Sequence, residues 1–144
     1  MKCLVIEMNE ETQKKMFEFQ LLQSHLQELQ RRQQLVAERI GELARTKAAF
    51  EELKTVKAGD AAMIPLGGEN FIPGKITDTK NVLVGVGGGI AIRKSADAAA
   101  ETLDGRIREM EHIADSLMGE VQSIVGQLTR IQTELEAQNR KSAD

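Results

Sequence analysis

Hydrophobic residues recur at alternating spacings of three and four along two long stretches of the chain. This is the heptad pattern of helices that pack along a seam. In the second stretch the pattern is nearly unbroken, and its positions are Leu103, Ile107, Met110, Ala114, Leu117, Val121, Ile124, Leu128, Ile131 and Leu135. In the first stretch the positions are Phe19, Leu22, Leu26, Leu29, Val36, Ile40 and Leu43, with Gln33 as a polar interruption. The pattern predicts one helix from about Asn9 to Ala58, with Asn9 as its cap, and a second helix that begins after a capping Ser95.

The segment between these helices changes to short strand-like runs separated by turn residues. Ala62–Leu66 and Asn70–Ile76 flank one glycine-rich turn, and Val82–Val86 and Ile90–Arg93 flank another. We predict two β-hairpins in succession. Because strand side chains alternate between faces, one apolar set of the second hairpin is expected on a single face, formed by Val82, Val84, Val86, Ile90 and Ile92.

The predicted fold class is α+β, a long antiparallel two-helix coiled coil joined through two β-hairpins. One domain covers residues 1–144, with the first helix in 1–58, the hairpins in 59–94 and the second helix in 95–144. At ~1.5 Å per residue, each helix would be a rod of roughly 70 Å. Because an isolated hairpin is marginally stable and exposes its strand edges, we expect these hairpins to assemble with strands of other chains.

Two local features refine this picture. After Leu43 a regular heptad places Lys47 and Lys54 on the seam, whereas the apolar residues present there are Phe50, Leu53 and Val56. The phase must therefore shift, either by local overwinding or at a functional hinge.

Pro65 and Pro73 fall within predicted strands, and because proline cannot donate to a strand ladder, we expect them at edge or bulge positions.

Composition argues against several classes of function. The chain has four Phe and no Tyr or Trp, so the aromatic groups that usually line a small-molecule pocket are nearly missing, and an enzyme is not predicted. Nineteen basic and twenty-two acidic residues give a net charge of −3 and are mixed along both helices, which does not favour a nucleic-acid partner. No segment approaches the ~20 apolar residues that cross a membrane, so no membrane partner is predicted.

Motifs for cofactors and metals are also incomplete. Residues 85–90 resemble a phosphate-binding glycine loop, but Ile90 stands where the dinucleotide fingerprint needs glycine, and a hairpin turn is the better reading. His25 and His112 lie on different helices, with no cysteine or second histidine at ligand spacing. We predict no cofactor, no metal and no catalytic residue.

Cys3 is the only cysteine, so no internal disulfide is possible and a cytoplasmic location is predicted. The apolar run Met1–Ile6 is too short for a signal peptide. Met8 directly precedes a polar, helix-favouring run, which leads to the hypothesis that Met8 is the true start of the protein.

Apolar residues also occur off the seam near the start of the first helix. Phe17 and Leu21 are four residues apart and are expected to point outward. Antiparallel pairing would bring Ile131 and Leu135 close to Leu22 and Phe19. This end is a candidate for binding the exposed hydrophobic surface of another protein, and packing within an oligomer is the alternative.

With the flanking helices, the central block resembles the alpha-type subunit of archaeal prefoldin. The most specific part of the resemblance is Met63-Ile64-Pro65-Leu66-Gly67-Gly68-Glu69-Asn70-Phe71-Ile72, followed by Val82-Leu83-Val84-Gly85-Val86-Gly87-Gly88-Gly89-Ile90-Ala91-Ile92-Arg93-Lys94. The resemblance implies that two such chains join four beta-type subunits through an intersubunit β barrel. It also implies that the coiled-coil tips bind unfolded proteins without ATP and deliver them to a group II chaperonin.

By the same resemblance, client contacts are expected at Met16, Phe17, Phe19, Leu21, Leu22, Ile131 and Leu135. The implied oligomer interface is formed by Ile64, Leu66, Phe71, Ile76, Val82, Val84, Val86, Ile90 and Ile92. The rival from another class is a structural coiled-coil scaffold or tether, which would assemble through the same strands but would have no affinity for unfolded chains.

Overall fold

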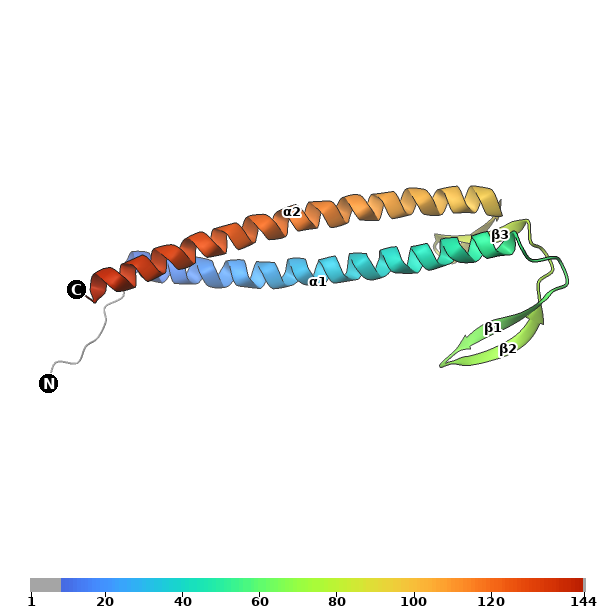
Figure 1. Ribbon diagram of the computed structural model, residues 1–144, viewed down its shortest axis with the longest axis horizontal. Helices are drawn as coiled ribbons and strands as arrows, with labels where there is room; N and C mark the ends of the chain where they lie inside the picture. Colours follow the sequence, from blue (N-terminus) through green and yellow to red (C-terminus); the bar gives the residue numbers. More distant parts are fainter. Residues whose placement is uncertain (1–8, 144) are drawn as a thin grey trace. The chain divides into compact units, whose positions relative to one another are not determined.

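The computed structural model describes residues 9–143, in which two long helices flank two antiparallel hairpins (Figure 1). The elements are α1 (Glu10–Leu53), β1 (Ala61–Gly67), β2 (Asn70–Lys75), β3 (Asn81–Gly87), β4 (Ile90–Ser95) and α2 (Ala96–Ser142). The predicted α+β architecture is confirmed for the single chain. The predictions for Cys3, for the segment before Met8 and for Met8 as the start lie outside the described residues.

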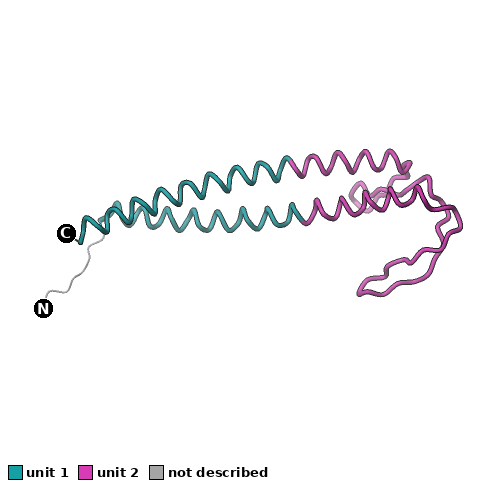
Figure 2. The backbone as a smooth tube through the Cα atoms, in the orientation of Figure 1, with its two compact units in different colours: residues 1–37, 112–144 teal, residues 38–111 magenta. Residues whose placement is uncertain are grey.

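The chain divides into two compact units, each built from parts of both helices (Figure 2). Unit 1 contains the described residues up to Ala37 together with those from His112 onward. Unit 2, Glu38–Glu111, contains the remaining parts of α1 and α2 and both hairpins. None of the helices within residues 9–143 carries an apolar stretch long enough to cross a membrane.

The core of unit 1 is the predicted heptad seam. Leu29, Leu117 and Ile124 are buried in one cluster. The partly buried residues that pack against it are Leu22, Leu26, Val36, Val121 and Leu128. Since these residues come from both α1 and α2 at heptad positions, the seam prediction is confirmed here.

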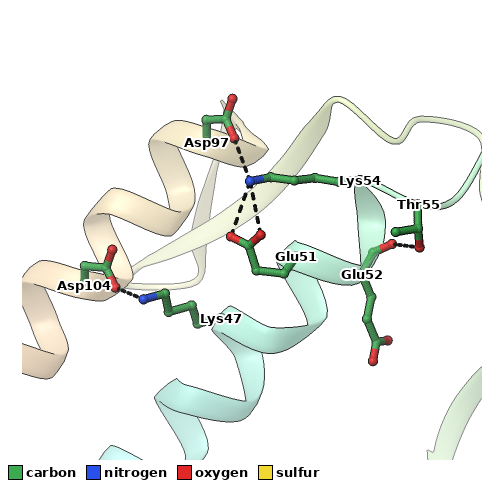
Figure 3. Close-up of polar contacts among 7 residues, drawn as sticks. All are labelled: Lys47, Glu51, Glu52, Lys54, Thr55, Asp97 and Asp104. Atoms are coloured by element: carbon green, nitrogen blue, oxygen red, sulfur yellow. Dashed lines mark hydrogen bonds and ion pairs between the residues drawn. The ribbon is translucent and has the colours of Figure 1, made fainter.

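In unit 2 the seam passes from Leu43 through a charged position before it becomes apolar again. Lys47 is half-buried and its Nζ lies 2.6 Å from Oδ1 of Asp104 on α2 (Figure 3). Phe50 and Leu53 are half-buried beyond it, whereas Lys54 is exposed and pairs with Glu51 and Asp97 at 3.2 and 3.6 Å. The expected change of phase therefore falls after Lys47. α1 is continuous through this change of phase.

α1 ends at Leu53, so the prediction that it runs to about Ala58 was wrong. The next turn tightens to bonds between residues three apart, from the backbone N–H of Lys54, Thr55 and Val56 to the carbonyls of Glu51, Glu52 and Leu53. The hydroxyl of Thr55 also donates to the carbonyl of Glu52 at 2.8 Å. The β-branched Thr55 and Val56 are poor helix formers, which favours the early end.

Both predicted helix caps are present. Oδ1 of Asn9 accepts a hydrogen bond from the backbone N–H of Glu11 at 3.3 Å, and Oγ of Ser95 accepts one from the N–H of Ala98 at 3.1 Å. Ser95 is also the last residue of β4. The second hairpin therefore passes directly into α2.

Each hairpin has a turn with positive φ at both central residues. These are Gly68 and Glu69 at 57° and 64°, and Gly88 and Gly89 at 60° and 75°. Such angles are those of type I′ turns, which match the right-handed twist of the strands. Each hairpin also has a bulge just before its turn, between Pro65 and Gly67 and between Gly85 and Gly87. Both hairpin predictions are confirmed, and both prolines lie in strands of two-stranded sheets.

Candidate protein-binding surfaces

The first candidate surface lies in unit 1, on the first turns of α1. Met16, Phe17 and Leu21 expose 40%, 63% and 55% of their surface. We call these three residues the end patch. Their heptad positions are off the seam, so α2 does not cover them. An apolar group exposed to this degree is a candidate site for contact with another protein.

Polar contacts tie the start of α1 to the last part of α2 beside the end patch. Nζ of Lys15 lies 3.3 Å from Glu11 and 3.4 Å from Glu134, and the hydroxyl of Thr12 donates to Oε1 of Gln138 at 2.8 Å. Desolvation would lower the pKa of Lys15, but its hydrogen bonds to Glu11 and Glu134 outweigh this effect and raise it. These contacts hold the backbone that presents the end patch.

The structure divides the predicted client-contact residues into two groups. Met16, Phe17 and Leu21 are exposed, whereas Phe19, Leu22 and Leu135 are half-buried and Ile131 is only 3% exposed. The second group belongs to the seam between α1 and α2. A client could reach Ile131 only if the helices separated, so the end patch is the part of the predicted set that is open to a partner.

Unit 1 also exposes four large apolar residues that were not among the predicted contacts. They are Leu35, Ile113, Met118 and Val125, which are 41% to 53% exposed. The heptad pattern places Met118, Val125 and Leu35 off the seam, because Met118 and Val125 each follow a seam residue directly and Leu35 lies two positions after Gln33.

The second candidate surface is formed by the hairpins of unit 2. Ile64, Leu66, Phe71, Val86, Ile90 and Ile92 are 45% to 67% exposed, and Ile76, Val82 and Val84 are half-buried. Met63, Ile72 and Leu83, which were not predicted contacts, are 48% to 70% exposed. So much exposed apolar surface on two small sheets is typical of a protein interface.

The registers decide which of these residues share a face. Ile64 lies opposite Ile72, and Pro65 lies opposite Phe71. Because neighbouring strand residues point to opposite faces, Phe71 lies on the other face of its hairpin from Ile64. In the second hairpin Val84 lies opposite Ile92, which agrees with the predicted single apolar face, while Leu83 belongs to the other face.

β3 also lines a small groove with both helices of unit 2. The groove has a volume of about 200 Å³, and Leu83, Val84 and Gly85 form its β3 side. Leu43 and Phe50 of α1 and Leu103 of α2 contribute its apolar helix side. The second hairpin is thus placed against the helix ends within this unit.

Comparisons with known proteins agree with this arrangement of elements. A family model described as "Prefoldin subunit" matches residues 22–141. The chain is 30% identical to prefoldin subunit alpha of Methanoculleus marisnigri over 85% of this chain and 87% of that protein. It is 36% identical to prefoldin subunit alpha of Thermococcus onnurineus over 72% and 71% of the two chains.

Other matches cover different shares of the chains. Identity to prefoldin subunit alpha 1 of Thermococcus kodakarensis is 37%, over 65% of this chain and 64% of that protein. Among solved structures, a chain from a cryo-EM structure of filamentous PFD from Methanocaldococcus jannaschii superposes with a TM-score of 0.70. It is 16% identical, and the superposition covers 85% of this chain and 98% of that one, which shows a shared fold.

Proposed function

Because this chain belongs to the prefoldin family, we propose that it is a subunit of a chaperone that holds unfolded proteins without ATP and delivers them to a group II chaperonin. Membership of the family supports a role in protein folding as a chaperone component. The mode of holding, the delivery step and a cytoplasmic location are our proposal for this chain.

The observation that carries the proposal is the end patch. Three large apolar side chains are exposed there, close together, on a helix pair whose heptad-position apolar residues pack in the seam. Exposed chain segments of an unfolded protein would gain by covering Met16, Phe17 and Leu21. Each contact of this size buries little surface and should release quickly, so several copies in one assembly would hold a client by avidity. Such a mechanism needs no nucleotide.

The hairpins supply the assembly in this proposal. Two copies of the chain would associate with four beta-type subunits through an intersubunit β barrel, to which the apolar faces of both hairpins contribute. The exposed Ile64, Val86, Ile90 and Ile92 would be covered there. Such burial would stabilise the assembly by ~25 cal/mol per Å² of apolar surface removed from water.

The proposal is tested by replacing Phe17 and Leu21 together with Ser in the assembled protein. We expect weaker suppression of light scattering when a chemically unfolded client is diluted into buffer without nucleotide. The double variant should keep its native mass and thermal stability, because both residues are exposed and surface substitutions usually change stability by less than ~0.5 kcal/mol.

Leu35→Ser is the matched control, because Leu35 is exposed to 51% on the same helix but lies outside the end patch. It should suppress aggregation as the unmodified protein does. If the double variant protects clients as well as the control does, the end patch is not the holding site. If the unmodified assembly gives no protection, a structural scaffold becomes the better function.

A further inference from the structure

Along residues 16–34, one side of α1 carries no charged residue. With Phe19 lettered a and Leu22 lettered d in the heptad, this side consists of the b and e positions, which lie next to the a positions on the helix surface. All its residues are exposed, and they are Met16, Gln20, Gln23, Gln27, Gln30 and Gln34. The charged residues of this part of α1 all fall at other heptad positions.

α2 has a matching uncharged strip. With Val121 as a and Ile124 as d, the b and e positions between Asp115 and Glu136 are all uncharged and exposed. They are Met118, Gln122, Val125, Thr129 and Gln132. Met118 and Val125, which are 53% and 45% exposed, are one heptad apart and therefore lie on the same side of α2.

An ion pair shows that the two strips lie on the same side of the helix pair. Lys15 occupies a d position of α1, and its Nζ lies 3.4 Å from Oε2 of Glu134, which occupies a g position of α2. Since g lies next to d on a helix surface, the g sides of the two helices face each other. The e sides must then meet on the other side of the seam. We call the two strips together the neutral face.

The opposite side of the same stretch, formed by the c and g positions, is charged. Its charged residues are Glu18, Glu28, Arg32, Glu120, Arg130 and Glu134. A charged group loses far more free energy than an uncharged amide when a contact removes it from water. Another chain that lies along the helix pair would therefore displace water at lower cost from the neutral face.

The side chains of the neutral face suit the main chain of an extended polypeptide. Each glutamine amide offers two donors and an acceptor, and an unfolded chain has N–H and carbonyl groups without intramolecular partners. Met118 and Val125 add apolar contacts for its side chains. A charged residue of that chain would lose water without gaining a partner, so the neutral face favours segments without charge.

Met16 belongs both to the end patch and to the neutral face. A chain that contacts Met16 and Phe17 can therefore continue directly onto Gln20. Met16 and Gln34 are 18 positions apart, which is about 27 Å along a helix at ~1.5 Å per residue. An extended segment of about eight residues, at ~3.3 Å each, has the same length.

We propose that the neutral face binds an extended, uncharged segment of an unfolded client, of about eight residues, while neighbouring apolar residues of that client occupy the end patch. This proposal rests on the proposed holding of unfolded proteins at the end patch. It adds the path that the client follows along the helix pair and the charge of the segment that binds there.

The test measures the affinity of fluorescent peptides for the assembled protein by anisotropy, without nucleotide. Each peptide has the same anchor of leucine and phenylalanine, followed by a tail of about eight residues. The tail is uncharged, or carries glutamates, or carries lysines. We expect the uncharged tail to bind at least about fivefold more tightly than either charged tail, because the neutral face offers no partner for a charge.

Gln23→Glu together with Gln30→Glu places carboxylates on the neutral face. Glutamate and glutamine have similar helix propensities, so the helix should persist, with circular dichroism as the check. We expect the uncharged tail to lose its advantage and the lysine tail to gain about fivefold in affinity. Ser116→Glu with Ser123→Glu is the matched control, because it adds the same charge at exposed c positions on the opposite side, and it should leave the order of the peptides unchanged.

Equal binding of all tails to the unmodified assembly, or equal effects of the two pairs of substitutions, would overturn the proposal. The end patch would still stand if Phe17→Ser with Leu21→Ser abolished binding of the anchor. If the anchor does not bind the unmodified assembly, the holding function and the neutral-face proposal both fail. A changed mass of the assembly in Gln23→Glu with Gln30→Glu would show that another subunit covers the neutral face, which would also overturn the proposal.

Discussion

At the scale of single residues, the side chain of Ile64 across the hairpin limits which residue can replace Gly74. A Cβ at this position would lie 3.3 Å from Cγ1 of Ile64 and 2.5 Å from its Cδ1, and the second distance is closer than side-chain atoms approach one another. Gly74 lies opposite Ala62, one diagonal step from Ile64 on the same face. The space left by glycine therefore accommodates the rotamer of Ile64, a residue of the proposed oligomer interface.

We expect Gly74→Ala to displace the Ile64 side chain at a cost of about 0.5–1.5 kcal/mol, the cost of an unfavourable rotamer. The Ile64 δ1-methyl resonance in a methyl NMR spectrum should shift. The control is Gly85→Ala, where a Cβ meets nothing within 4 Å and the backbone N–H is kept. An unmoved Ile64 methyl group in Gly74→Ala would show that the contact does not persist in solution.

At the scale of elements, the side-chain carboxylate of Asp78 stabilises the connection between the two hairpins. Asp78 accepts hydrogen bonds from the backbone N–H groups of Lys80 and Asn81 at 2.9 and 3.1 Å, and from the side-chain amide of Asn81 at 3.2 Å. The bond from the Lys80 N–H, together with those from Asn81, lowers the pKa of Asp78 below its ordinary value of 3.8. The turn into β3 thus depends on the ionised form.

Because the folded-state pKa of Asp78 is lowered, its stabilising contribution is present above the unfolded pKa and is lost as the pH falls through the folded one. We expect the amide resonances of Lys80 and Asn81 to titrate with a midpoint below 3.8. Asp78→Asn should abolish that titration, and it should destabilise the turn at neutral pH but not in strong acid. A midpoint at or above the ordinary value would contradict the hydrogen bonding described.

At the scale of the whole molecule, the hairpins of a single chain expose large apolar residues to solvent. Val84 and Ile92 are directly opposite on one face of the second hairpin, and Ile92 is 45% exposed in the isolated chain. An aspartate in place of Val84 would be buried in any interface that covers this face. An unpaired charge in such a place costs several kcal/mol.

Val84→Asp should therefore break the assembly while leaving the coiled coil folded. The measurement is the mass of the complex by native mass spectrometry, with helicity by circular dichroism. Ala91→Asp is the matched control, because Ala91 is an exposed β4 residue next to Ile92 on the opposite face, and it should retain the native mass. Loss of assembly in both variants would mean that both faces of the hairpin are covered.

The helices, the hairpins and the seam could be predicted from the sequence alone, because they arise from short-range periodicity. Residues at heptad spacing must lie on one helix face, and glycines that adopt positive φ permit tight turns. The caps at Asn9 and Ser95 were also predictable, since a capping side chain bonds to a backbone only two or three residues away. Exposure of Phe17 and Leu21 was predictable from the same heptad count.

The accessibility of the other candidate residues and the pairing of the strands depend on contacts between segments that are separate in the sequence. Ile131 was a predicted contact but is buried, because its exposure depends on how closely α1 and α2 pack. The end of α1 at Leu53 depended on a competition between helix and turn hydrogen bonds that periodicity does not resolve. The position of Pro65 and Pro73 in the strand ladder required the register, since a shift of one residue would have turned one of the two toward the partner strand.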